Sequence, residues 1–132
     1  MPSGLRVSIL GGGSAYTPGL IEGFIRLKDK VPLERLVLMD IDSRKLSIVG
    51  TMVKAMLEAE MPGAQVDLTQ DRLEAIRDMD FILCQIRVGG LAARHLDESI
   101  ALDLGVVGQE TTGPGGFSMA LRTIPVMVEI AR

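Results

Sequence analysis

Aromatic residues are scarce in this sequence of 132 residues, which has no tryptophan, one tyrosine and three phenylalanines. Few side chains are therefore available to stack on nucleic-acid bases. A basic excess is lacking too, because 14 Lys and Arg stand against 17 Asp and Glu and the net charge is −3. Without a positive field to attract a polyanion, we expect no nucleic-acid partner.

Long apolar runs and cysteine pairs are also missing. Every hydrophobic run is short and is broken by a charge or a glycine, so we expect no membrane span. The first residues, MPSGLRVSIL, lack the long apolar core of a signal peptide. The single cysteine excludes an internal disulfide framework, and a reducing, cytoplasmic location is the simplest interpretation.

The remaining composition is that of an ordinary globular domain, with 47 % hydrophobic and 23 % charged residues. The chain ends in PVMVEIAR, an apolar and helical pattern that no glycine or polar stop follows. We therefore expect residues 1–132 to be one N-terminal domain of a longer protein rather than a small complete domain.

Short apolar runs alternate with helical patterns along the chain. The predicted strands cover residues 5–10, 36–39, 65–69 and 81–86. Two predicted helices start from caps at Thr17 and Ser43, and further ones span residues 73–79, 93–104 and 117–132, with residues 105–116 irregular. Such alternation favours parallel strands with right-handed crossovers. The predicted fold is a Rossmann-like, doubly wound α/β sheet, mostly parallel, with helices on both faces.

A glycine turn joins the first predicted strand to the first predicted helix. It consists of Gly11, Gly12 and Gly13, followed by Ser14. Glycine lets the backbone approach a pyrophosphate, and a helix N-terminus offers N–H groups and a partial positive charge. The third glycine of the G-x-G-x-x-G pattern is absent, because Tyr16 stands at that offset. Taken alone, the turn is also compatible with a purely structural role.

An acidic residue follows the second predicted strand. Asp40 stands where a carboxylate can accept hydrogen bonds from both ribose hydroxyls of a dinucleotide. Its charge would repel a 2′-phosphate, so the pattern favours NAD over NADP. Asp42 could share that role, but we interpret it as a carboxylate at a helix start. A glycine turn and an acidic strand end in this order predict dinucleotide binding.

The segment after the fourth predicted strand is rich in glycine and charge. Arg87 and the pair Gly89-Gly90 follow that strand, and Arg94 begins the helix behind them. A guanidinium in a cleft matches a phosphate through bidentate, charge-assisted bonds, although a lone arginine is often a solvated surface charge. Glu110 lies in a loop between glycines, where it could hold sugar hydroxyls, tune a neighbouring base or face water.

The single histidine and the single cysteine give no metal-ligand spacing. His95 reads as an ordinary helix residue, and Cys84 lies in the apolar run FILCQI, so we expect it in the core. No metal site is predicted within the chain.

Four stretches of the sequence together resemble glycoside hydrolase family 4. They are GGGSAYTPGLIEG, DID, IRVGGLAARHLDE and GVVGQETTGPGGFSMALR, and the resemblance covers essentially the whole chain. Within the family, SAYTP and QETTG most resemble 6-phospho-β-glucosidases. Most glycosidases place two carboxylates around the scissile bond, and this family is a known exception.

The resemblance implies a redox-neutral hydrolysis of 6-phosphorylated glucosides or disaccharides. NAD+ takes hydride from C3 of the sugar, and a tyrosine removes the proton at C2. A divalent metal, commonly Mn²⁺, stabilises the enediolate. The leaving group is eliminated, water adds, and NADH returns the hydride.

The resemblance also implies roles for particular residues. Gly11, Gly12, Gly13, Ser14 and Asp40 would bind NAD.

A second group of residues would serve the substrate and the reaction. Arg87 would border the nicotinamide, Arg94 would bind the substrate at its 6-phosphate, and Glu110 would raise the basicity of the catalytic tyrosine. The family's metal-binding Cys and His, its catalytic tyrosine and its proton-donating Asp have no counterpart here, and Tyr16 is not that tyrosine. We therefore expect the chain alone to bind NAD weakly at best and to be inactive, and the full-length enzyme to be a homo-oligomer.

Three alternatives stay open at the level of the sequence. One is another family 4 activity, such as a 6-phospho-α-glucosidase, an α-galactosidase or an α-galacturonidase. Another is a lactate- or malate-type NAD-dependent dehydrogenase, which shares the sheet and the glycine turn but releases NADH. The last is a non-enzymatic dinucleotide-binding module.

Overall fold

A computed structural model describes residues 4–132. These residues form two compact units, one ending at Ile86 and the other spanning Arg87–Arg132. The first unit holds a sheet of four strands in the order β3-β2-β1-β4, with every neighbouring pair parallel. The strands are β1 (Leu5–Leu10), β2 (Leu33–Met39), β3 (Gln65–Thr69) and β4 (Phe81–Cys84). The predicted parallel α/β sheet is confirmed.

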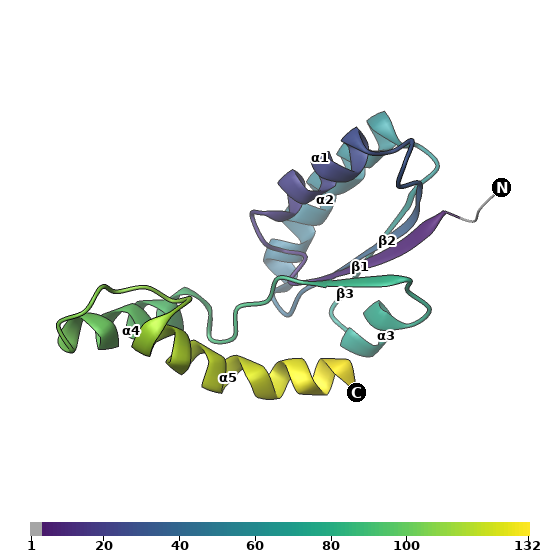
Figure 1. The fold of residues 1–132 in the computed structure, drawn as a ribbon. Helices are drawn as coiled ribbons and strands as arrows, with labels where there is room; N and C mark the ends of the chain where they lie inside the picture. Colours follow the sequence, from purple (N-terminus) through teal and green to yellow (C-terminus); the bar gives the residue numbers. More distant parts are fainter. Residues whose placement is uncertain (1–3) are drawn as a thin grey trace. The chain divides into compact units, whose positions relative to one another are not determined.

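Helices cover both faces of this sheet. They are α1 (Thr17–Arg26), α2 (Ser43–Glu60) and α3 (Arg72–Ile76). Helices α1 and α2 lie on one face and the short α3 on the other (Figure 1). The first face is the larger core, in which Ile9 and Leu36 from the sheet pack with Ile21 and Leu57 from the helices. Full burial of one such aliphatic side chain contributes about 1.5–3 kcal/mol, so this face dominates the stability of the unit.

The strand register aligns the ends of three strands. Leu10 pairs with Met39 on one side and with Cys84 on the other. The residues that follow these strand ends therefore lie next to one another at the carboxyl edge of the sheet. In a parallel α/β sheet this edge is where ligands bind.

The second unit consists of α4 (Gly90–Asp103) and α5 (Gly113–Ala131). The prediction that residues up to Gly116 are irregular is wrong, because α5 begins at Gly113. Pro114 stands in the first turn of that helix, where its missing N–H costs nothing. Among residues 4–132, no helix combines the length and apolarity needed to cross a bilayer.

The helix starts in the first unit also differ from prediction by one residue. Tyr16 precedes α1 and Thr17 is already helical, while Asp42 caps α2 in place of Ser43. The Asp42 carboxylate accepts the N–H of Lys45 at 3.0 Å, and this bond lowers the pKa of Asp42. The interpretation of Asp42 as a carboxylate at a helix start agrees with this contact.

Candidate functional site

The glycine turn lies between the end of β2 and the residue that follows β4, and it contacts both. The N–H groups of Gly11 and Gly12 both donate to the carbonyl of Met39, at 2.9 and 2.8 Å. Gly11 has φ +86°, a conformation that L side chains rarely adopt, and a Cβ there would lie 2.8 Å from the carbonyl oxygen of Gln85. The turn can therefore close on both neighbouring strands only with glycine at this position.

Asp40 holds the next part of the turn. One oxygen of its carboxylate accepts the N–H of Gly13 and the other accepts the N–H of Asp42, each at 2.9 Å. An ionised carboxylate has about four lone-pair sites, so Asp40 retains acceptor capacity after these two bonds. Its position at the end of β2 is the one the sequence predicted.

A third residue of this edge, Gln85, was not singled out from the sequence. Its side-chain amide donates to Thr17 Oγ1 at 2.6 Å and to the carbonyl of Gly11 at 3.2 Å. The Thr17 hydroxyl is fully buried. A polar residue near the end of the apolar run FILCQI was the available signal, because an amide that becomes even partly buried needs hydrogen-bond partners.

Most amides of the turn are used to build it. The N–H of Ser14 donates to the carbonyl of Gly11, the N–H of Tyr16 to Ser14 Oγ, and the N–H of Thr17 to the carbonyl of Ser14. With Gly11, Gly12 and Gly13 already paired, Ala15 has the one N–H between Gly11 and Thr17 for which the described structure records no acceptor. This amide stands just before α1, where the helix dipole adds positive partial charge.

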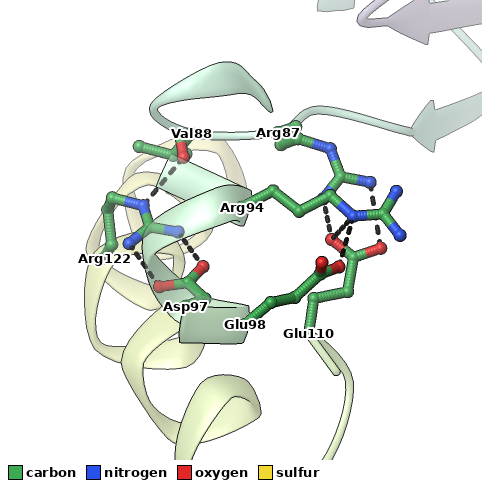
Figure 2. Close-up of polar contacts among 7 residues, drawn as sticks. All are labelled: Arg87, Val88, Arg94, Asp97, Glu98, Glu110 and Arg122. Atoms are coloured by element: carbon green, nitrogen blue, oxygen red, sulfur yellow. Dashed lines mark hydrogen bonds and ion pairs between the residues drawn. The ribbon is translucent and has the colours of Figure 1, made fainter. Parts of the chain in front are cut away.

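The second unit brings Arg87, Arg94 and Glu110 together (Figure 2). The guanidinium of Arg87 grips both oxygens of the Glu110 carboxylate: Nη1 contacts Oε2, and Nη2 donates to Oε1 at 3.2 Å. Arg94 Nε donates to Glu98 Oε1 at 2.7 Å and lies 3.5 Å from Glu110 Oε2. Figure 2 shows dashed contacts from Arg94 to these two carboxylates at Nε and none at its two terminal nitrogens.

Two glycines of α5 let the loop that carries Glu110 pack closely. A Cβ on Gly115 would clash with the carbonyl oxygen of Gln109, and one on Gly116 would lie 2.7 Å from the carbonyl carbon of Thr111. Residues 105–112 can therefore fold against the start of α5. This packing leaves the Glu110 side chain only 17 % exposed, beside its two arginines.

A separate ion pair in this unit involves residues that the sequence did not single out. Arg122 donates to both carboxylate oxygens of Asp97, and the Asp97 side chain is 2 % exposed. The hydrogen bond from Arg122 lowers the pKa of Asp97, and the same bond raises the pKa of Arg122. Nothing in the local sequence distinguishes these two from surface charges.

The two residues judged ordinary from the sequence are both at the surface. His95 is exposed on α4. The prediction that Cys84 lies in the core is wrong, because β4 forms an edge of the described sheet and leaves Cys84 exposed, although partial burial of its thiol raises its pKa. Within residues 4–132, no three His, Cys, Asp or Glu side chains gather as metal ligands.

Comparison with curated proteins finds close relatives of the whole chain. It is 51 % identical over 134 aligned residues to a probable 6-phospho-beta-glucosidase of Bacillus subtilis, which covers 100 % of this chain and 30 % of that protein. It is 44 % identical to 6-phospho-alpha-glucosidase 1 of Lacticaseibacillus paracasei, over 92 % of this chain and 28 % of the relative. The chain thus spans less than a third of these relatives.

Solved structures agree with the sequence relatives. A 6-phospho-alpha-glucosidase from gut microorganisms, in complex with NAD and Mn²⁺, superposes with a TM-score of 0.91 at 43 % identity, covering 98 % of this chain and 30 % of that one. The Thermotoga maritima 6-phospho-beta glucosidase with manganese, NAD+ and glucose-6-phosphate gives a TM-score of 0.89 at 38 % identity, covering 96 % and 30 %. The family model for family 4 glycosyl hydrolases matches residues 6–132, and the chain belongs to that family.

Proposed function

We propose that this chain is the NAD-binding, N-terminal part of a 6-phospho-glucosidase that hydrolyses 6-phosphorylated glucosides with NAD and a divalent metal. The observation that carries the proposal is the Asp40 carboxylate held on the N–H of Gly13, because it joins an acidic strand end to a closed glycine turn. The relatives solved with NAD and Mn²⁺ support the choice of cofactors.

In the first unit the proposed ligand is the dinucleotide. Gly11, Gly12, Gly13 and Ser14 shape the turn, and the N–H of Ala15 faces the pyrophosphate from the N-terminus of α1. Asp40 accepts the hydroxyls of a ribose with the lone pairs that its two backbone bonds leave over. When bound, NAD would supply a reversible hydride acceptor for the sugar.

In the second unit the proposed ligand is the phosphate of the sugar. The two terminal nitrogens of Arg94, which have no dashed contact in Figure 2, form a planar pair of donors that matches two phosphate oxygens. The Glu110 carboxylate contacts both Arg87 and Arg94. Its proposed action on a catalytic tyrosine, and the proposed place of Arg87 beside the nicotinamide, depend on residues outside this chain.

The metal and the anomer are the remaining parts of the proposal. We infer that the ligands of Mn²⁺ come from residues outside this chain. Within residues 4–132, no three His, Cys, Asp or Glu side chains gather as metal ligands. We also propose the β-glucoside as substrate. The relative at 51 % identity is named a probable 6-phospho-beta-glucosidase, whereas the relative at 44 % is named for the α-linkage.

The test uses the full-length protein that carries this chain, incubated with 6-phospho-α- and 6-phospho-β-glucosides with and without NAD+ and Mn²⁺. We expect hydrolysis that requires both cofactors, prefers the β-linkage and accumulates no NADH. Steady NADH production from a 2-hydroxy acid, with no hydrolysis, would overturn the proposal in favour of a dehydrogenase.

Arg94→Ala tests the phosphate site in the same protein. Loss of charge-assisted bonds to the phosphate should raise KM for the phosphorylated glucoside about 10- to 100-fold. The matched control is Arg26→Ala on α1, because Arg26 makes a similar i,i+4 pair with Glu22 at 2.7 Å. An unchanged KM in Arg94→Ala removes Arg94 from the site.

A further inference from the structure

Arg122 on α5 uses three of its nitrogens at once. Its Nη1 and Nη2 donate to the two oxygens of Asp97 at 3.2 and 2.6 Å, and its Nε donates to the carbonyl of Val88 at 2.8 Å. Figure 2 shows the guanidinium of Arg122 between the Asp97 carboxylate on α4 and the Val88 carbonyl. One side chain of α5 therefore connects a helix and the turn that precedes it.

That turn begins directly after Arg87. Gly89 has φ +84°, and the N–H of Gly90 donates to the carbonyl of Arg87 at 3.1 Å. A Cβ on Gly89 would lie 3.3 Å from Arg122 Nε, so the backbone passes close to the guanidinium. The bond to Val88 thus fixes the direction in which the chain leaves Arg87.

Stability alone does not explain this arrangement. The buried Asp97 carboxylate and the partly buried Arg122 guanidinium lose hydration, and well-packed apolar residues of similar volume are often as stabilising. A planar guanidinium that donates to three acceptors also fixes the orientation of those acceptors, which a flexible ammonium does not do.

We propose that Arg122 is a positioning residue. By holding the Val88 carbonyl, it keeps Arg87 bonded to Glu110, and this bond in turn keeps Glu110 in place beside Arg94. The effect on substrate rests on the proposed function of Arg94 as the phosphate ligand. The hydrogen bonds that form this clamp, from Arg122 to Val88 and from Arg87 to Glu110, do not depend on that function.

Arg122→Lys is the discriminating variant. Lysine keeps a positive charge for Asp97. It lacks the planar guanidinium that donates to Asp97 and to the Val88 carbonyl at the same time. In the full-length protein we expect a thermal midpoint close to that of the unmodified protein. Amide exchange of the Gly90–Ala93 backbone should be about 10-fold faster, because one hydrogen bond that holds the turn is lost. KM for the phosphorylated glucoside should rise about 10-fold, with kcat changed less.

A double-mutant cycle separates positioning from general damage. If Arg122 acts through Arg87, Arg122→Lys should raise KM no further in an Arg87→Gln background. Arg35→Gln is the control, because Arg35 makes an exposed pair with Asp67 at 2.8 Å in the other unit. Additive effects on KM, a fall in kcat with KM unchanged, or unaltered exchange in both Arg122→Lys and Arg122→Gln would each overturn the inference.

The clamp can be tested even if the proposed function fails. If the unmodified full-length protein hydrolyses no phospho-glucoside, KM and kcat cannot be measured and the proposed role of Arg94 is refuted. A crystal structure of Arg122→Lys then shows whether Arg122 keeps Arg87 in contact with Glu110. We expect the contact between Arg87 Nη2 and Glu110 Oε1, 3.2 Å here, to be broken. An intact contact would refute the positioning role.

Discussion

The carboxylate of Asp40 accepts the backbone N–H of Gly13 at 2.9 Å, although the two residues are 27 positions apart in the sequence. The acid at the end of β2 therefore has a structural task before any ligand binds. It fixes the part of the glycine turn that leads into α1. A change at either residue should affect both the turn and the proposed dinucleotide site.

Gly13→Ala should weaken NAD binding. A Cβ at this position would lie 2.8 Å from Asp40 Oδ2 and 3.0 Å from the backbone nitrogen of Leu46, so Asp40 must move away. Losing the Asp40 contact and its acceptor position should raise the dissociation constant of NAD at least about 10-fold. Isothermal titration calorimetry on the full-length protein measures this constant.

Gly23→Ala on α1 is the matched control for that experiment. A Cβ on Gly23 would meet nothing within 4 Å. Alanine in a helix interior is about 0.5–1 kcal/mol more favourable than glycine, so the control should be slightly more stable and should bind NAD normally. Equal affinities in the two variants would contradict the proposed role of the turn.

Asp40→Asn should relax the choice between NAD and NADP. The neutral amide no longer repels a 2′-phosphate, and it cannot accept from Gly13 and Asp42 with both of its polar atoms. We expect weaker NAD binding and a ratio of NADP to NAD dissociation constants that falls about 10-fold. If the ratio stays at the value of the unmodified protein, Asp40 does not contact the ribose.

The residues that the sequence predicted well are those with local signals. Gly11 follows a strand and Asp40 follows the next one, and strand ends can be located from short apolar runs alone. The interactions of Gln85 could not be derived in this way. Its partner Thr17 is 68 positions away, and only the pairing of β1 with β4 brings them together.

The same limit explains the errors in the second unit. The Asp97–Arg122 pair and the bond to Val88 depend on the packing of α4 with α5, which periodicity does not determine. Residues GPGG were predicted as irregular because glycine disfavours helix. In the structure these residues form the first turn of α5. Close packing leaves no room for a Cβ on Gly115, beside Gln109 and Asp97, or on Gly116, beside Thr111.

Ser8→Ala should stabilise the protein. Ser8 is fully buried in β1, and its Oγ has no hydrogen-bond partner among the described residues. Removing a buried hydroxyl without a partner should add about 1 kcal/mol to the free energy of unfolding. Thr17→Val is the comparison, since Thr17 Oγ1 accepts from Gln85 and its loss should cost about 1–3 kcal/mol. Urea unfolding measures both, and destabilisation by Ser8→Ala would reveal an unseen partner.

The acid dependence of stability should report on Asp97. Hydrogen bonds from Arg122 hold the pKa of Asp97 below its ordinary value, so folding favours the ionised carboxylate. The resulting stabilisation is fully present above the unfolded pKa of about 3.9, and it is lost as the pH falls from there through the folded pKa. Asp97→Asn lacks this titration, so the stability gap between it and the unmodified protein should be widest near neutral pH and should narrow below about pH 4.

Unfolding midpoints at a series of pH values between 7 and 3 test this dependence, with Ser8→Ala as the reference. That variant changes no titratable group, so its offset from the unmodified protein should stay constant over the series. A gap for Asp97→Asn that is equally constant would mean that the carboxylate titrates alike in the folded and unfolded chains. The bonds from Arg122 would then not favour its ionised form, and Arg122 would have to hold the Val88 turn without an ionic anchor on α4.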